Sequence, residues 1–286
     1  MQFLLNGRFV AAQDARVSVS DRGFLYGDAA FDTLCAYGGR AFRAAQHLQR
    51  LSQSLASLRI EFPRTAAQME GDLYQVIERN DVRDAILRIT VSRGSGARGP
   101  SIRGVSAPTY LIACYPASLS DAAKASVTLE QVSVRRTPAA SLPAHAKTAN
   151  YLNSILALAE ATEAGADEAL LLDMRGCIAE CAYSNIFFVS DSALLTPALD
   201  AGILPGITRA AVLELARGRG IEVRETAIEP SIALAADEAF ITNSVRGVVP
   251  VHAIGTRIFQ APGGLTSRIV QWYWELVESE AGPRWP

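Results

Sequence analysis

The sequence predicts a two-domain protein of mixed α/β and α+β class. Its 286 residues are enough for one large domain or two ordinary ones. Strand and helix patterns alternate along the chain, and a short polar stretch that begins with proline interrupts them at 116–124. These observations favour two lobes of comparable size with a site between them.

The first domain is predicted over residues 1–116. It begins with a β-hairpin, because two short apolar runs flank Asn6–Gly7, and a second hairpin is expected around Gly38–Gly39. Leucines recur at helical spacing over 44–59, which predicts an amphipathic helix. The remaining elements expected here are a helix over 65–79 and strands over 85–94 and 109–116.

An interdomain linker is predicted at 117–124, and a second domain follows it over 125–286. Two helices are expected in this domain, over 150–165 with Gly165 at its end and over 207–220 after a Pro-Gly turn. The strands expected here cover 126–134, 168–173, 177–190, 193–197, 238–243 and 247–254.

Composition excludes several classes of function. A net charge of −2 and a pI near 6.0 argue against nucleic-acid and anionic-membrane partners. We find no basic, apolar leader and no apolar run long enough to span a membrane. The four cysteines fit no zinc-binding spacing, and we expect no metal site. A cytoplasmic protein is therefore expected.

Lysine is rare in this chain, which has two lysines and 25 arginines. Arginine can replace lysine in a salt bridge but not as a nucleophilic amine, because a guanidinium group stays protonated. Lys147, in the stretch "AHAKTANYLN", is thus a candidate for covalent chemistry with a carbonyl group. The alternative is an ordinary surface lysine, as we expect for Lys124.

Pyridoxal phosphate is the carbonyl compound that a protein most often holds permanently on a lysine. It also needs an acid at its pyridine nitrogen and an anion site for its phosphate. Glu180, in an apolar strand pair, is the candidate acid, unless it turns to solvent. The backbone amides of Ile207 and Thr208 form a candidate anion site, because they follow a Pro-Gly turn at a helix start.

Other polar residues could complete such a site. Asn243 and Ser244 lie in a short polar turn and offer donors, and Arg50 could bind a phosphate bidentately if it is not a solvated helix residue. The glycine-rich loop 92–100 carries Arg93 and Arg98, either of which could hold a carboxylate or phosphate.

These pieces together resemble the class IV (fold type IV) pyridoxal-phosphate enzymes, which include D-amino-acid and branched-chain aminotransferases and 4-amino-4-deoxychorismate lyase. The resemblance runs from about residue 3 to residue 255. The motifs that carry it, in chain order, are "SDRGFLYGD", "HLQRL", "SRGSGARG", "KTANYLN", "ADEALLLD…GCIAECAYSNIFF", "LPGITR" and "ADEAFITNS…PV". It implies a two-domain fold with the cofactor between the domains, and a homodimer.

The resemblance also implies roles for single residues. Lys147 matches the lysine that forms the Schiff base with pyridoxal 5'-phosphate and moves the substrate proton. Glu180 matches the acid at the pyridine nitrogen. Arg50 matches the phosphate arginine. Ile207, Thr208 and Ser244 match residues that assist it at the phosphate.

The substrate residues decide the branch of the family. In the D-amino-acid aminotransferases a Tyr, an Arg and a His hold the substrate carboxylate. Here Phe31 and Pro100 stand at the Tyr and His positions, and only Arg98 remains. The loss of two donors weakens the binding of a carboxylate. Arg246 could meet a second carboxylate.

This loss of two donors counts against an ordinary D-amino-acid aminotransferase, and the motifs "RGSGARG" and "TNSVRGVVPV" resemble the lyase branch more closely. We therefore expect a small amino substrate that carries a carboxylate, with 4-amino-4-deoxychorismate lyase as the leading function, which gives 4-aminobenzoate and pyruvate. The "FDT" motif, with Asp32, and the "KTANYLNS" and "LPGITR" motifs favour the alternative. That alternative is a D-amino-acid, branched-chain or (R)-amine transaminase. A rival from another class is an anion-binding protein without catalytic activity.

Overall fold

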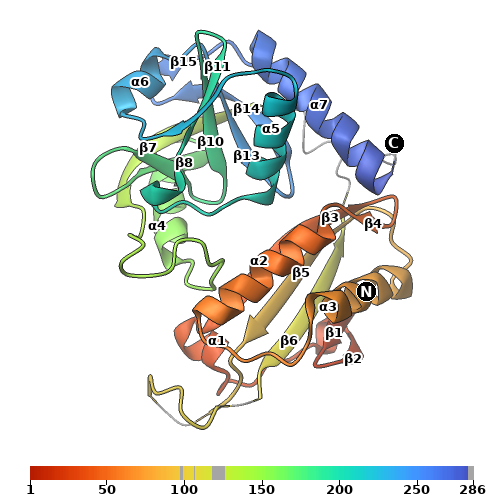
Figure 1. Ribbon diagram of the computed structural model, residues 1–286. Coiled ribbons are helices and arrows are strands. Elements are labelled where there is room, and N and C mark those ends of the chain that lie inside the picture. The colour runs from red at the N-terminus through yellow and green to blue at the C-terminus, as the bar shows by residue number, and fades with distance from the viewer. Residues whose placement is uncertain (97–98, 106, 118–125, 283–286) are drawn as a thin grey trace. The chain divides into compact units, whose positions relative to one another are not determined.

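The computed structural model describes residues 1–96, 99–105, 107–117 and 126–282. They form two compact units (Figure 1). The first takes in the described residues within Met1–Ser120, Ala146–Asn150 and Val277–Pro286, and the second those within Asp121–His145 and Tyr151–Leu276. Most of the predicted linker, 118–124, lies outside the described residues, so the predicted domain boundaries stay a prediction.

The first unit is built on a sheet that has six strands in the described residues, in the order β2-β1-β6-β5-β3-β4, with neighbouring strands antiparallel. The strands are β1 Gln2–Leu5, β2 Arg8–Ala11, β3 Ala29–Tyr37, β4 Arg40–Ala41, β5 Ala85–Ser92 and β6 Thr109–Pro116. The helices are α1 Arg22–Tyr26, α2 Ala44–Ser57 and α3 Ala66–Arg79. The predicted hairpin turn at Asn6–Gly7 is confirmed, with both residues at positive φ.

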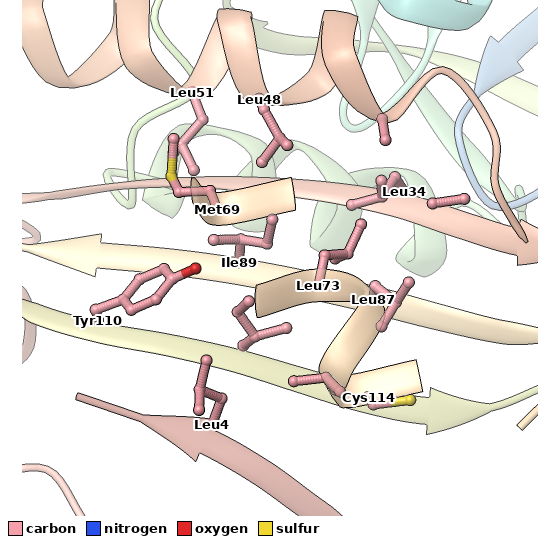
Figure 2. Packing of buried hydrophobic residues seen from close by; sticks show 14 of the residues in the cluster. Leu4, Leu34, Leu48, Leu51, Met69, Leu73, Leu87, Ile89, Tyr110 and Cys114 are labelled. Atoms are coloured by element: carbon pink, nitrogen blue, oxygen red, sulfur yellow. The ribbon is translucent and has the colours of Figure 1, made fainter. Parts of the chain in front are cut away.

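Helices α2 and α3 cover one face of this sheet (Figure 1). Their apolar residues pack on the residues of β3, β5 and β6 that point to the same side, as Figure 2 shows for Leu48, Met69, Leu34 and Ile89. The side chains of a strand alternate between the two faces of its sheet, so Asp32 shares this helix-covered face with Leu34. One carboxylate of β3 is therefore buried beneath α2.

The second unit is built on a sheet that has nine strands within the described part of the chain. The order is β12-β11-β10-β13-β14-β7-β8-β9, and β15 pairs with β14. The strands are β7 Val127–Arg135, β8 Glu168–Leu172, β9 Ile178–Cys181, β10 Asn185–Ser190, β11 Ala193–Pro197, β12 Val223–Thr226, β13 Glu238–Asn243, β14 Gly247–Ile254 and β15 Arg257–Ile258. The helices are α4 Leu152–Glu163, α5 Ile207–Gly218, α6 Pro230–Ala235 and α7 Gly264–Ala281, whose end belongs to the first unit.

The predicted helix over 150–165 begins later than expected, at Leu152. Residues 147–149, just before the predicted start, pair with β3, and the Asn150 side chain donates a hydrogen bond to Gly27 O. The helical pattern of the sequence is therefore overridden at its start by tertiary pairing.

Candidate active site

Lys147 lies on a short segment that runs antiparallel to the start of β3 in the first unit. Phe31 N donates to Lys147 O at 3.0 Å, Ala149 N donates to Ala29 O at 2.8 Å, and Thr148 bridges to Ala30. The Lys147 N–H donates to Ser54 Oγ of α2 at 3.0 Å. Both backbone polar groups of Lys147 are thus bound, which fixes the point from which its amine extends.

The Phe31 ring contacts two cations. Its centroid is 4.6 Å from Lys147 Nζ and 3.6 Å from Arg88 Cζ. The structure thus brings together two predicted site residues, Lys147 and Phe31, and adds Arg88, which was not among the predicted site residues. The available signal was an arginine between Leu87 and Ile89 in a strand pattern, but it could not show which face of the sheet Arg88 occupies.

Arg50 is buried on α2 against Asp32 of β3, so it is not a solvated helix residue. Its Nε donates to Asp32 Oδ2 at 2.9 Å and its Nη2 to Asp32 Oδ1 at 2.8 Å. His47 Nδ1 lies 2.8 Å from Asp32 Oδ1, and Thr33 N donates to the same oxygen at 2.8 Å. This carboxylate fixes the guanidinium plane of Arg50.

The charges of this cluster are set by its burial and by its partners. Burial raises the pKa of Asp32, but the Arg50 charge and the His47 contact outweigh it and hold this pKa far below its ordinary value. Burial lowers the pKa of His47, in spite of Asp32. At neutral pH the cluster therefore holds an ionised Asp32 and a neutral His47, whose Nδ1–H donates to that carboxylate.

Glu180 is buried in the second unit, at the end of β9, and not turned to solvent. Its Oε1 lies 2.7 Å from Arg136 Nε. Its Oε2 accepts from Asn185 Nδ2 at 3.1 Å and from Leu204 N at 3.0 Å. An arginine and two neutral donors thus hold one carboxylate in a single orientation.

Helix α5 begins next to this carboxylate, since Asn185 also donates to Leu204 O at 3.0 Å. Gly206 is its N-cap and offers no side-chain cap to the first amides, which include those of Ile207 and Thr208. A Cβ at Gly206 would come within 2.1 Å of Asn185 Oδ1, so this close approach requires glycine. The amides at the start of this 12-residue helix suit an anion.

The turn after β13 carries the other predicted residues. Asn243 Oδ1 accepts from Val245 N at 3.0 Å and from Arg246 N at 2.8 Å, and its Nδ2 donates to Ser184 Oγ at 3.1 Å. The Asn243 side chain thus shapes the turn on which half-buried Ser244 lies. Thr242 pairs with Asn185 in register, so this turn and the Glu180 cluster lie at the same end of the sheet.

Glu168 is a second buried carboxylate near this turn, and its sequence pattern indicated only the start of a strand. It accepts from Tyr183 N and from Ser184 Oγ, both at 2.9 Å. Burial raises the pKa of Glu168 to about 7, although both bonds and the charge of Arg246 act to lower it.

The predicted residues thus gather in two groups. The first unit provides an amine, Lys147, and a cation, Arg50; the second provides a fixed carboxylate, Glu180, and the start of α5. Arg98 lies outside the described residues, and its predicted role stays a prediction. In the part of the chain that the structure describes, no group of three or more His, Cys, Asp or Glu residues could hold a metal ion. No helix there is long and apolar enough to cross a membrane.

Comparisons with known proteins agree on one family. The model of the family Amino-transferase class IV matches residues 29–254. A Methanocaldococcus jannaschii protein, provisionally named a branched-chain-amino-acid aminotransferase, is 41% identical to this chain. The match covers 90% of this chain and 89% of the relative. The aminodeoxychorismate lyase of Bacillus subtilis is 31% identical over 98% of both chains.

A solved structure shows the same fold. The branched-chain amino acid aminotransferase of Thermobaculum terrenum, in its pyridoxal-phosphate (holo) form, superposes with a TM-score of 0.88. The two chains are 28% identical, and the match covers 98% of this chain and 94% of that one.

Proposed function

Because the chain belongs to the amino-transferase class IV family, we propose that it is a transaminase that moves the amino group of a branched-chain amino acid to a 2-oxo acid. The predictions of this family, of fold type IV, of an enzyme and of pyridoxal 5'-phosphate as its cofactor are confirmed. The predicted branch of the family, however, changes. The likenesses above support a transaminase, our alternative, better than the lyase that we placed first.

The residues present fit the cofactor. Thr242 Oγ1 is buried and has no hydrogen-bond partner among the described residues, and Thr242 shares a sheet face with its cross-strand neighbour Asn185, which contacts Glu180. A buried hydroxyl of this kind is usually paired, so it suits a bound polar group. Lys147 would hold the cofactor through its amine.

The phosphate and the pyridine nitrogen would meet different residues. Arg50, the amides of Ile207 and Thr208, and Ser244 would hold the phosphate, and Glu180 would meet the ring nitrogen. When bound, pyridoxal phosphate supplies a ring that withdraws electrons from the substrate carbon.

The chain's own residues would then place charge and move protons. Arg136, Asn185 and Leu204 N keep the Glu180 carboxylate in one orientation, so its negative charge needs no rearrangement during the reaction. The Lys147 amine would take the proton from the substrate carbon and return it, as a general base and acid.

We infer the substrate class from the Phe31 ring, which lies beside the Lys147 amine and also contacts Arg88. An aromatic ring at the reactive amine favours an apolar substrate side chain. Arg88 comes from β5 and contacts the same ring, so it is a second cation that would suit the second carboxylate of an acceptor such as 2-oxoglutarate. Apolar donor and dicarboxylic acceptor are thus both accommodated.

The lyase is the second candidate, since the Bacillus subtilis relative matches the chain over nearly its full length. The half-buried Arg246 could meet a second substrate carboxylate in that reaction.

The deciding experiment offers three amino compounds to the purified holoenzyme: L-leucine, D-alanine and 4-amino-4-deoxychorismate. The two amino acids are added first alone and then together with 2-oxoglutarate. We expect L-leucine alone to change the visible band of the cofactor completely, and L-leucine with 2-oxoglutarate to give glutamate, with little response to the other two compounds. Release of 4-aminobenzoate at a higher kcat/KM than leucine turnover would instead establish the lyase.

Substitutions sharpen this test. Lys147→Ala should abolish turnover and the visible band, whereas Lys124→Ala, at the other lysine of the chain, should leave both unchanged. Arg88→Met should raise KM for 2-oxoglutarate about tenfold or more, in line with the loss of a charge-assisted bond, and change KM for leucine less than twofold. An equal rise in both KM values would contradict the role of Arg88.

The assembly that we propose is a homodimer. Helix α4 buries Ala157 and Ala161 but exposes Leu152, Ile155 and Leu156, so it is apolar on opposite faces. We propose that a second copy of the chain covers the exposed face. Light scattering on a sizing column should give a molar mass of two chains. Ile155→Asp should lower the measured mass towards that of one chain. A wild-type monomer would contradict the dimer.

A further inference from the structure

Ser54 lies in the last turn of α2 and is completely buried. Its Oγ donates to Arg50 O at 2.8 Å and accepts from Lys147 N at 3.0 Å. A backbone N–H can only donate, so the single hydroxyl proton goes to the carbonyl and the direction of both bonds is fixed. The Ser54 side chain therefore joins the helical turn of Arg50 to the backbone of Lys147, which lies 93 residues after Ser54.

A second serine on the same helix shows what is particular to this one. Ser52 Oγ donates to Leu48 O at 2.9 Å, which is the same bond to the carbonyl four residues earlier. Ser52 is half-buried, and within the described residues its hydroxyl contacts no second element. Such bonds do not strengthen a helix, and alanine is the better helix former. The helix alone therefore gives no reason for a buried serine at position 54.

The reason lies in the backbone of Lys147. Its carbonyl accepts from Phe31 N in the pairing with β3, while its N–H turns to Ser54. Without the hydroxyl, this N–H would lose the acceptor that Ser54 provides, and one of the two backbone bonds that hold Lys147 would be gone. The amine is at the end of a long side chain, so a small rotation of the backbone moves it a long way.

We propose that Ser54 is a positioning residue that holds Lys147 in register with Arg50. The inference rests on the proposed function, in which Lys147 provides the reactive amine and Arg50 binds the phosphate. Asp32 fixes the guanidinium of Arg50, and Ser54 ties the backbone of that same residue to Lys147. The amine and the phosphate cation are thereby kept at a constant separation, as a cofactor that must touch both requires.

The first test uses the protein without cofactor and compares Ser54→Ala with Ser52→Ala. Alanine is smaller than serine and favours a helix, so both variants should fold. Hydrogen exchange of the Lys147 amide, read by mass spectrometry with residue-level fragmentation, should be at least about tenfold faster in Ser54→Ala and unchanged in Ser52→Ala. Equal exchange in the two variants would overturn the link between Ser54 and Lys147.

The second test uses the holoenzyme. Ser54→Ala should lower kcat about tenfold, in line with a small misplacement of the amine, while KM changes less than twofold. It should also shift the pH midpoint of the cofactor's visible band. Ser54→Thr, which keeps a hydroxyl group, should restore both. A loss of thermal stability with unchanged kcat and midpoint would mean a structural role only and would overturn the proposal.

Failure of the proposed function has a different signature. If Lys147→Ala retained the visible band of the cofactor, Lys147 would not be the reactive amine, and Ser54 would have no amine to position. Faster exchange at the Lys147 amide in Ser54→Ala would then establish the hydrogen bond between Lys147 and Ser54, but not a role in catalysis.

Discussion

Asp32 and Glu168 are both carboxylates with almost no exposed surface, one in each unit, yet their charges are controlled in opposite directions. Asp32 is bound by an arginine at two points and by a histidine. Glu168 is bound by a backbone N–H and a hydroxyl, both neutral. The pKa of Asp32 is held far below its ordinary value, and that of Glu168 is raised to about 7.

Burial acts in the same direction on both groups, because it raises the pKa of any carboxylate. The difference is that only Asp32 has a cation in contact, and that contact outweighs burial. Glu180 belongs with Asp32 in this respect, since Arg136 touches it. Among the described residues, Asp32 and Glu180 therefore each have an arginine in contact. Glu168 accepts only from neutral donors, and its pKa is about 7.

The largest effect is expected from Asp32→Asn. The substitution removes the carboxylate charge that the buried Arg50 contacts at two points, which should lower the free energy of unfolding by about 3–5 kcal/mol. Urea unfolding at neutral pH measures this. Asp72→Asn is the matched control, because its partner Arg64 is one-third exposed, and it should cost about 1 kcal/mol. Equal losses would contradict the special position of Asp32.

Arg136→Met should make Glu180 behave like Glu168. Removing the cation leaves a buried carboxylate with neutral donors, so the free energy of unfolding should fall by about 2 kcal/mol, less than for a fully enclosed pair. Affinity for the cofactor, followed by its visible band, should fall at the same time. The exposed neighbour Arg135→Met should change neither, and an unaltered cofactor affinity in Arg136→Met would argue against Glu180 at the ring nitrogen.

Glu168→Gln should alter the pH dependence of stability. The pKa of Glu168 is 4.5 when exposed and about 7 in the fold, so the folded chain binds the extra proton between these values. The free energy of unfolding of the wild type therefore loses up to about 1.4 kcal/mol per pH unit from this group as pH rises from 4.5 to 7. Urea unfolding across this window should show that the variant lacks this contribution. An unchanged slope would mean that Glu168 is ionised throughout.

The smallest effect is expected from His47→Phe. It removes one neutral donor from Asp32, at a cost of about 1 kcal/mol at neutral pH. The pKa of His47 is below its ordinary 6.5, so the unfolded chain binds the proton first and wild-type stability falls as pH drops below 6.5. The variant should lose less stability on acidification. A steeper acid loss than in the wild type would show that His47 is protonated in the fold.

Local patterns were enough to predict much of the fold. The leucine spacing over 44–59 predicted α2, and Asn6–Gly7 predicted the first hairpin, because both depend on residues close together in the sequence. Lys147 was found by its chemical type alone, against a background of arginine. These features carry their own evidence within a few residues.

The partners of the site residues could not be predicted in this way. Asp32 was noted only as an acid, since its contact with Arg50 depends on which face of β3 lies beneath α2. Arg136, Glu168 and Ser54 were missed for the same reason: each acts on a residue of another element. A sequence shows which groups are present, but only the fold shows which of them touch.

The pairing of residues 147–149 with β3 also bears on how the chain is made. Ala29–Phe31 lie on an edge of β3 that no other strand of the described sheet covers, since β4 pairs only with Ala36 and Tyr37. On the ribosome this edge stays open until residues 147–149 emerge, after all six strands of the first unit's sheet have been synthesised. An unpaired strand edge invites another chain to dock. A nascent chain that stalls before Lys147 should thus be the form most prone to aggregate and most in need of a chaperone.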